Sequence, residues 1–186
     1  ARAIVNGPEL LLMDEPFASL DKNLRENIVT QIRSLLQEKE ITTLVVTHDY
    51  SEASTLGDYI GILDQGKIEQ WDTDENLYRN PQSIVVAKAV WDGTILDASD
   101  YKKLFNIPSE NSFFILRPED VRIDPNGAFT GKITNRKGRG NNNLVTCRIN
   151  QTQIDIELYI SSRPLPNVGD VLSICITHES CTPIPQ

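Results

Sequence analysis

The chain has 186 residues, of which 39% are hydrophobic and 24% charged, and its formal net charge is -8. This composition is typical of a folded globular protein with a buried core, and it excludes a highly charged disordered chain. The acidic balance argues against general electrostatic attraction to nucleic acid or to anionic lipid. No run reaches about 18 apolar residues and no charged-then-apolar leader is seen, so neither a transmembrane helix nor a signal peptide is expected.

Residues that often bind metals or form disulfides are scarce. Cys147, Cys175 and Cys181 are an odd number of cysteines without CxxC spacing. We therefore expect free thiols in a reducing cytoplasm, with neither a disulfide framework nor a zinc site. The only histidines, His48 and His178, give little support to a histidine-based metal site.

The first half of the chain alternates helix and strand patterns. Residues 1–5 lack Met and resemble the end of a helix, so we expect a segment to precede them. The apolar run 10–13 predicts a strand buried on both faces of a parallel sheet. An apolar stripe over 22–38 predicts a helix with Asp21 as its N-cap, and the β-branched run 42–47 predicts the next strand. Strand, helix and strand in this order indicate a parallel α/β sheet with a right-handed crossover.

A short helix and a hairpin follow. We expect the helix over 51–56 and the hairpin strands over 59–63 and 67–70, with Gly66 in the turn. Residues 61–67 satisfy the glycine and lysine spacing of a P-loop. However, an isoleucine replaces the required hydroxyl, and the segment does not join a strand to a long helix, so the turn interpretation is preferred.

The second half predicts a different architecture. After a short helix near residues 83–89, the segments become short and strand-like, with frequent turn residues. In several of these segments apolar and polar residues alternate, and this alternation predicts a small all-β barrel or sandwich. We therefore divide the chain into residues 1–88, of α/β type, and residues 89–186, of β type. The expected strands of the second domain include residues 113–116, 121–123, 131–133, 144–149, 154–158 and 171–176.

Two strand ends of the first domain carry candidate catalytic residues. Asp14 and Glu15 follow the apolar strand, and His48 follows the next one. Ligands bind at the carboxyl edge of open parallel sheets. There Asp14 could hold Mg²⁺, Glu15 could polarise a water that attacks a terminal phosphate, and His48 could hydrogen-bond that phosphate. The alternatives are that Asp14 and Glu15 form an acidic turn after a core strand and that His48 has an ordinary polar role. The occurrence of all three residues together favours a functional site.

These residues resemble a known family. The segment 11–21 is similar to the Walker B motif and D-loop of ATP-binding cassette (ABC) proteins, and 47–49 to their switch motif. Residues 1–4 resemble the helix that follows their signature sequence. Glu52-Ala53, Gly66-Lys67-Ile68 and Pro81 continue the pattern of ATPase subunits from binding-protein-dependent importers. Residues 117–121, Arg-Pro-Glu-Asp-Val, are similar to the OB-like, TOBE-type domain of that branch.

The resemblance implies a role for each matching residue. Glu15 matches the catalytic glutamate, Asp14 the magnesium-site aspartate and His48 the switch histidine, which also contacts the nucleotide. Ser19 and Asp21 match D-loop positions at the nucleotide sandwich between two ATPase subunits. The implied fold is the C-terminal part of a P-loop NTPase followed by an OB-like barrel. The implied cofactors are ATP and Mg²⁺.

The resemblance also implies partners and a location. The partners are a second ATPase subunit, membrane-spanning permease subunits and, indirectly, a solute-binding protein; no nucleic acid is expected. The chain would act on the cytoplasmic face of the cell membrane. The transported solute would be selected by the other components. The β domain would contribute to dimer contacts, or would bind a small ligand or a regulatory partner.

Essential parts of the ABC motor are absent from this sequence. It contains no P-loop, Q-loop or signature motif. Without P-loop amides and lysine little remains to cradle phosphates, so we expect the isolated chain neither to bind ATP usefully nor to hydrolyse it. The chain would then be a fragment of a full ATPase, or else a split or degraded gene product. The truncated sheet should expose apolar surface.

Three other interpretations stay open. The chain could be a non-catalytic regulatory or ligand-binding module built on its β domain. It could instead be an ATPase of the DNA-repair or chromosome-structure type, although the adjoining β domain and the lack of heptads oppose this. The basic loop 136–143 could bind single-stranded nucleic acid, but it lacks interleaved aromatic residues, and a solvated hairpin tip is preferred.

Overall fold

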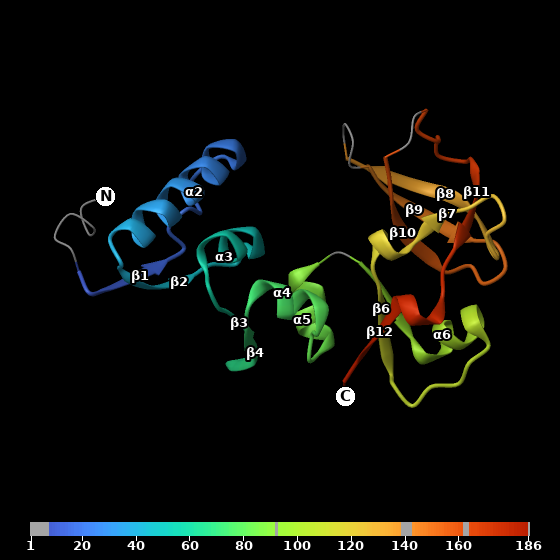
Figure 1. The fold of residues 1–186 in the computed structure, drawn as a ribbon, viewed down its shortest axis with the longest axis horizontal. Helices are drawn as coiled ribbons and strands as arrows, with labels where there is room; N and C mark the ends of the chain where they lie inside the picture. Colours follow the sequence, from blue (N-terminus) through green and yellow to red (C-terminus); the bar gives the residue numbers. More distant parts are fainter. Residues whose placement is uncertain (1–7, 92, 139–142, 162–163, 186) are drawn as a thin grey trace. The chain divides into compact units, whose positions relative to one another are not determined.

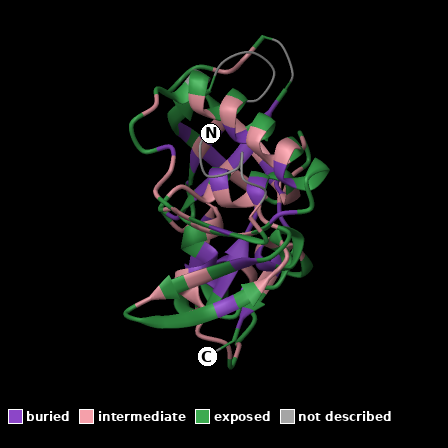
Figure 2. Ribbon diagram, turned by 90° about the vertical axis from the view of Figure 1, so that its left-hand side faces the viewer, coloured by how far each residue is buried: buried purple, intermediate pink, exposed green. Residues whose placement is uncertain are grey.

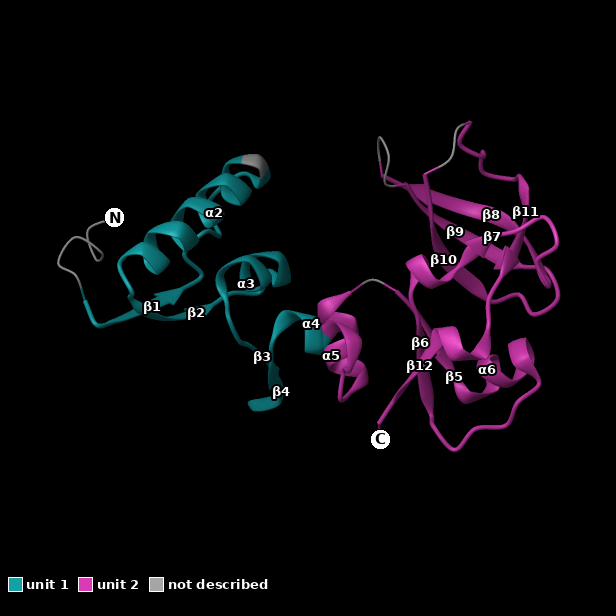
Figure 3. Ribbon diagram, viewed as in Figure 1, with its two compact units in different colours: residues 1–77 teal, residues 78–186 magenta. Residues whose placement is uncertain are grey.

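Two compact units make up the computed structural model (Figure 3): Ala1–Leu77 and Tyr78–Gln186. The structure describes residues 8–91, 93–138, 143–161 and 164–185. The expected helix end at residues 1–5 and half of the basic loop 136–143, namely residues 139–142, lie outside these ranges. The boundary between the two compact units falls between Leu77 and Tyr78. It does not test the predicted boundary between the ATPase-type and β-type domains at residues 88 and 89, which stays a prediction.

The first unit is built on two parallel strands joined by a long helix (Figure 1). Leu10 pairs with Thr42 and Asp14 with Val46, which confirms the parallel pairing expected from the strand order. The elements of this part of the chain are β1 (Leu10–Asp14), α2 (Lys22–Glu38), β2 (Thr42–Val46), α3 (Tyr50–Leu56), β3 (Ile60–Asp64), β4 (Lys67–Asp72) and α4 (Asp74–Arg79).

Helix α2 covers one face of this two-stranded sheet. Leu11 of β1 is buried in a cluster with Leu36 and Ile41, at and beyond the end of α2. The other face is exposed: Leu10 and Leu12 are 57% and 66% exposed, and Leu44 is 49% exposed. The prediction of a strand buried on both faces is therefore wrong, because α2 covers only one face. The expected exposure of apolar surface is found.

The β3–β4 hairpin contains residues 61–67, whose glycine and lysine spacing matches that of a P-loop. Ile60 pairs with Asp72 and Asp64 with Lys67 in antiparallel register. Gln65 and Gly66 join the strands with φ angles of 45° and 79°. Two successive positive φ angles are characteristic of a tight hairpin turn of type I′. The structure thus confirms the turn interpretation of residues 61–67.

The second unit is mostly β, and its two antiparallel sheets surround its core. The orders are β10-β9-β8-β11-β7 and β12-β6-β5. The buried residues, coloured purple in Figure 2, include Ile133, Val145, Ile156, Leu158 and Ile174. The elements are α5 (Ile84–Val90), β5 (Thr94–Asp97), α6 (Ala98–Phe105), β6 (Phe113–Leu116), β7 (Arg122–Ile123), β8 (Phe129–Lys137), β9 (Asn143–Ile149), β10 (Asp155–Ile160), β11 (Val171–Cys175) and β12 (Cys181–Ile184), with single 3₁₀ turns at Pro118–Asp120 and His178–Ser180.

Helix α6 makes the expectation of an all-β second domain incomplete. The Asp97 side chain accepts a hydrogen bond from the amide of Asp100 at 2.8 Å and caps the N-terminus of the helix. Asn106 ends the helix in the left-handed conformation, with φ 56°. Between these ends, Tyr101 stacks on Phe114 with ring centroids 3.9 Å apart. Capping and aromatic packing thus stabilise a helix of only two turns.

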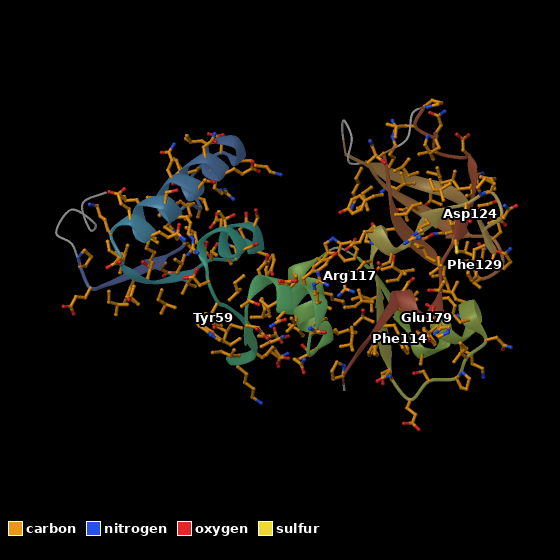
Figure 4. All side chains as sticks on the ribbon, in the orientation of Figure 1. Tyr59, Phe114, Arg117, Asp124, Phe129 and Glu179 are labelled. Atoms are coloured by element: carbon orange, nitrogen blue, oxygen red, sulfur yellow. The ribbon has the colours of Figure 1, made fainter. Side chains whose placement is uncertain are left out.

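Arg117, labelled in Figure 4, is a buried charge in the second unit. Its guanidinium donates to the backbone carbonyls of Tyr78 and Arg79 and to the Thr182 hydroxyl at 2.9 Å. The two carbonyls are the last of α4, where a helix carries partial negative charge. The charge is therefore paired with acceptors at Tyr78, Arg79 and Thr182, all within the second unit.

Candidate functional site

The ends of β1 and β2 bring the predicted catalytic residues together. Asp14 is the last residue of β1, opposite Val46, the last residue of β2. The Glu15 amide extends this pairing by donating to the Val46 carbonyl at 2.9 Å. Glu15 and His48, 33 positions apart in the sequence, therefore leave the same edge of the sheet. This is the carboxyl edge, where ligands bind in open parallel sheets.

Glu15 and His48 are in direct contact. The Nδ1 atom of His48 lies 2.9 Å from both carboxylate oxygens of Glu15. The His48 side chain is 75% exposed and that of Glu15 is 37% exposed. Hydrogen bonding and charge attraction from Glu15 raise the pKa of His48 above its ordinary value, while Glu52 and Asp49 add smaller contributions in the same direction. The pair can therefore hold or transfer a proton at a solvent-accessible position.

Glu15 adopts an unusual backbone conformation. Its φ angle is 43°, in the left-handed region that residues with a side chain rarely occupy. The hydrogen bond to Val46 fixes its amide, and its carbonyl accepts from the Ala18 amide at 3.4 Å. Such a conformation costs about 1–3 kcal/mol and persists where the surroundings impose it, often at functional sites. The sharp turn directs Glu15 out of the strand and toward His48.

Asp14 is an exposed carboxylate beside this pair. Within the ranges that the structure describes, it has no hydrogen bond or ion pair that would occupy it. An exposed carboxylate fits Mg²⁺, which prefers oxygen ligands and keeps several waters. In the same ranges, no three His, Cys, Asp or Glu side chains gather into a metal site. A magnesium ion here would thus need further oxygen ligands, such as nucleotide phosphates.

Ser19 and Asp21 lie on the loop between β1 and α2, and both are exposed. Asp21 accepts a hydrogen bond from the Leu24 amide at 3.1 Å. This confirms its predicted role as the N-cap of α2. No contact from Ser19 brings it to the Glu15–His48 pair in the described parts of the chain. The structure therefore joins Glu15 to His48 directly and places Ser19 and Asp21 on the adjoining loop.

Four residues around the site make contacts that the sequence did not predict. The Thr47 hydroxyl donates to the Glu52 carboxylate at 2.7 Å. Arg25 lies within 3.5 Å of Glu52 and bonds to Asp49 at 3.3 Å. The signal available in the sequence was weak, because an arginine one turn into an amphipathic helix is usually a solvated surface residue.

Comparisons with known proteins show which families this sequence resembles. Residues 114–184 match the TOBE domain family. The spermidine/putrescine import ATP-binding protein PotA of Clostridioides difficile is 34% identical over 75% of this chain and 45% of its own length. The Fe(3+) ions import ATP-binding protein FbpC of Haemophilus influenzae is 33% identical over 94% of this chain and 54% of its own length. The chain thus spans about half the length of these relatives.

The chain is a relative of the ATP-binding subunits of ABC importers, and its second unit carries a TOBE domain. The uncharacterized ABC transporter ATP-binding protein YdcT of Escherichia coli is also similar, with 38% identity over 68% of this chain and 37% of its own length. In the described parts of the chain, no helix is both long and apolar enough to cross a membrane.

Proposed function

We propose that this chain contributes the Walker B, D-loop and switch-histidine part of an ATPase subunit that couples ATP hydrolysis to solute import. The observation that carries the proposal is the contact between Glu15 and His48, at the carboxyl ends of adjacent parallel strands. Two residues of matching type, brought together from distant positions at the edge where ligands bind, support a catalytic site more strongly than either motif alone.

In this proposal each residue has one task. Glu15 orients and polarises the attacking water, and His48 holds Glu15 in place and donates to the terminal phosphate. Asp14 binds Mg²⁺ directly or through water; when bound, the ion neutralises charge on the phosphate oxygens. Ser19 and Asp21 face the second ATPase subunit across the nucleotide. The P-loop that cradles the phosphates must come from outside these 186 residues, because the sequence contains none.

The proposed partners follow from the same assignment. The subunit would pair with a second ATPase subunit and dock on membrane-spanning permease subunits at the cytoplasmic face of the membrane. Similar proteins are named for polyamines in one case and for ferric iron in another. We therefore assign energy coupling to this chain and selection of the solute to the other components of the importer.

The test is Mg-ATP hydrolysis by the native protein that contains this chain. Glu15→Gln removes the carboxylate that polarises water but keeps its size, so turnover should fall by about 10²-fold or more while ATP binding persists. Glu38→Gln is the control, because Glu38 is an exposed glutamate at the end of α2, away from the site. Wild-type turnover in Glu15→Gln would contradict the proposal.

A further inference from the structure

One guanidinium connects the two loops that carry the candidate catalytic residues. Arg25 Nη2 donates to the Leu20 carbonyl at 2.9 Å, on the loop between β1 and α2. Its Nη1 donates to the Asp49 carboxylate at 3.3 Å, on the loop after β2. The planar guanidinium presents several donors in a fixed geometry, so it can bind both loops at once. Arg25 thus fixes the spacing between these loops from the first turn of α2.

Glu52 completes this connection as a buried carboxylate. Its side chain is only 6% exposed. One oxygen accepts from the Thr47 hydroxyl at 2.7 Å, and the other lies 3.5 Å from the Nε atom of Arg25. A buried charge is costly unless hydrogen bonds and an opposite charge compensate for it. Both partners are therefore needed for Glu52, and both lie beside the site.

The residues on either side of His48 are held by this network. The Thr47 hydroxyl donates to Glu52 and also accepts from the Asp49 amide at 3.1 Å. The Asp49 side chain caps α3 by accepting from the Ser51 amide at 2.9 Å. His48 itself is 75% exposed, and among the described residues its side chain bonds only to Glu15. Its orientation thus depends on anchored neighbours more than on packing of its own ring.

We propose that Arg25 and Glu52 are positioning residues that hold His48 against Glu15 by fixing the two loops after β1 and β2. Neither residue touches the proposed reacting atoms. Their role in catalysis rests on the proposed function, since it matters for turnover only if Glu15 and His48 form the catalytic pair. The geometric part, that their loss releases His48 from Glu15, stands independently of any activity.

The molecule offers a matched control on the same helix. Arg33 lies eight residues after Arg25 in α2, and the two side chains are 25% and 24% exposed. Arg33 also bonds one backbone carbonyl, that of Leu56, and one carboxylate, that of Asp58. It contacts neither catalytic loop in the described structure. Arg25→Ala and Arg33→Ala therefore remove similar interactions, but only Arg25 contacts the two loops that carry Glu15 and His48.

The experiment is nuclear magnetic resonance on the 186-residue chain without nucleotide. It records the nuclear Overhauser effect between the His48 ring and the Glu15 side chain, together with the couplings that report the His48 χ1 rotamer. We expect Arg25→Ala to reduce the Overhauser effect at least about twofold and to give averaged couplings, as expected for a side chain moving between rotamers. Arg33→Ala should keep both wild-type values.

A second variant keeps the test decisive if Arg25→Ala does not fold. Glu52→Gln preserves side-chain size and can still accept from Thr47, but it loses the charge that attracts Arg25. It should also weaken the His48–Glu15 effect. Wild-type values in Glu52→Gln and in any folded Arg25→Ala would overturn the proposal, as would an equal loss in Arg33→Ala. Because no nucleotide is used, this result is separate from the hydrolysis test, and either idea can fail while the other stands.

Discussion

At the scale of single residues, the contact between His48 and Glu15 has a consequence for pH. Glu15 raises the pKa of His48, so this ion pair contributes its full stabilisation below the ordinary histidine value of about 6.5 and loses it as the pH rises through the raised value. In Glu15→Gln the pKa of His48 should fall back toward its ordinary value. Titration of the His48 ring by nuclear magnetic resonance measures this directly.

The control for this titration is His178, which is about half exposed and lies in the second unit. The ring resonances of His178 should be the same in wild type and in Glu15→Gln. Both partners of the His48–Glu15 pair are substantially exposed, so salt should also weaken the shift. A His48 titration that is unchanged by Glu15→Gln would show that the carboxylate is not its main partner.

The residue types at the site could be predicted from the sequence, but their contacts could not. The apolar run before Asp14 and the β-branched run before His48 both indicate strands, and parallel pairing brings their ends together. The left-handed backbone of Glu15 and the network of Arg25 and Glu52 depend on side-chain directions in the folded loops. Spacing along the chain carries no signal for those directions.

At the scale of elements, helix α2 depends on its N-cap. The Asp21 carboxylate satisfies the Leu24 amide, one of the first-turn amides without an intrahelical partner. Asp21→Ala should lower the free energy of unfolding of the first unit by about 1 kcal/mol. Asp21→Asn retains an oxygen acceptor and should cost far less. Denaturant unfolding followed by circular dichroism measures both, and equal losses would argue against capping.

The uncovered face of the β1–β2 sheet predicts self-association. Leu10, Leu12, Leu44 and Val46 are all between 49% and 66% exposed. Clustered apolar surface of this kind drives association in water. Leu12→Lys should therefore reduce the weight-average mass in analytical ultracentrifugation. Val168→Lys is the control, because Val168 is 62% exposed but belongs to the second unit; the same effect from both variants would contradict the idea.

Element boundaries followed the sequence closely where a cap or a turn marked them. The predicted helix 22–38 matches α2 at both ends, since Asp21 caps it and the apolar stripe stops with it. Helix α6 was missed because it is only eight residues long and stands among strand-like segments. The uncovered face of β1 was missed because an apolar run alone cannot tell whether both faces are covered.

At the scale of the whole molecule, the two units differ in the extent of their cores. The core of the second unit joins residues from both of its sheets and from α6, whereas the first unit contains small separate clusters around Leu11 and Phe17. Limited proteolysis should therefore digest the first unit sooner and leave a fragment that contains residues 114–184. Mass spectrometry identifies it, and survival of the first unit alone would contradict this prediction.

We propose that these residues work within a larger ATPase, and the intact mass of the native protein tests this proposal. The protein would be isolated from its source with an antibody against residues 114–184, then weighed and mapped by peptides. Since similar proteins are about twice as long, we predict a native mass about twice 20.9 kDa, with a P-loop peptide. A native mass near 20.9 kDa, without such a peptide, would contradict it and favour a regulatory protein built on the TOBE domain.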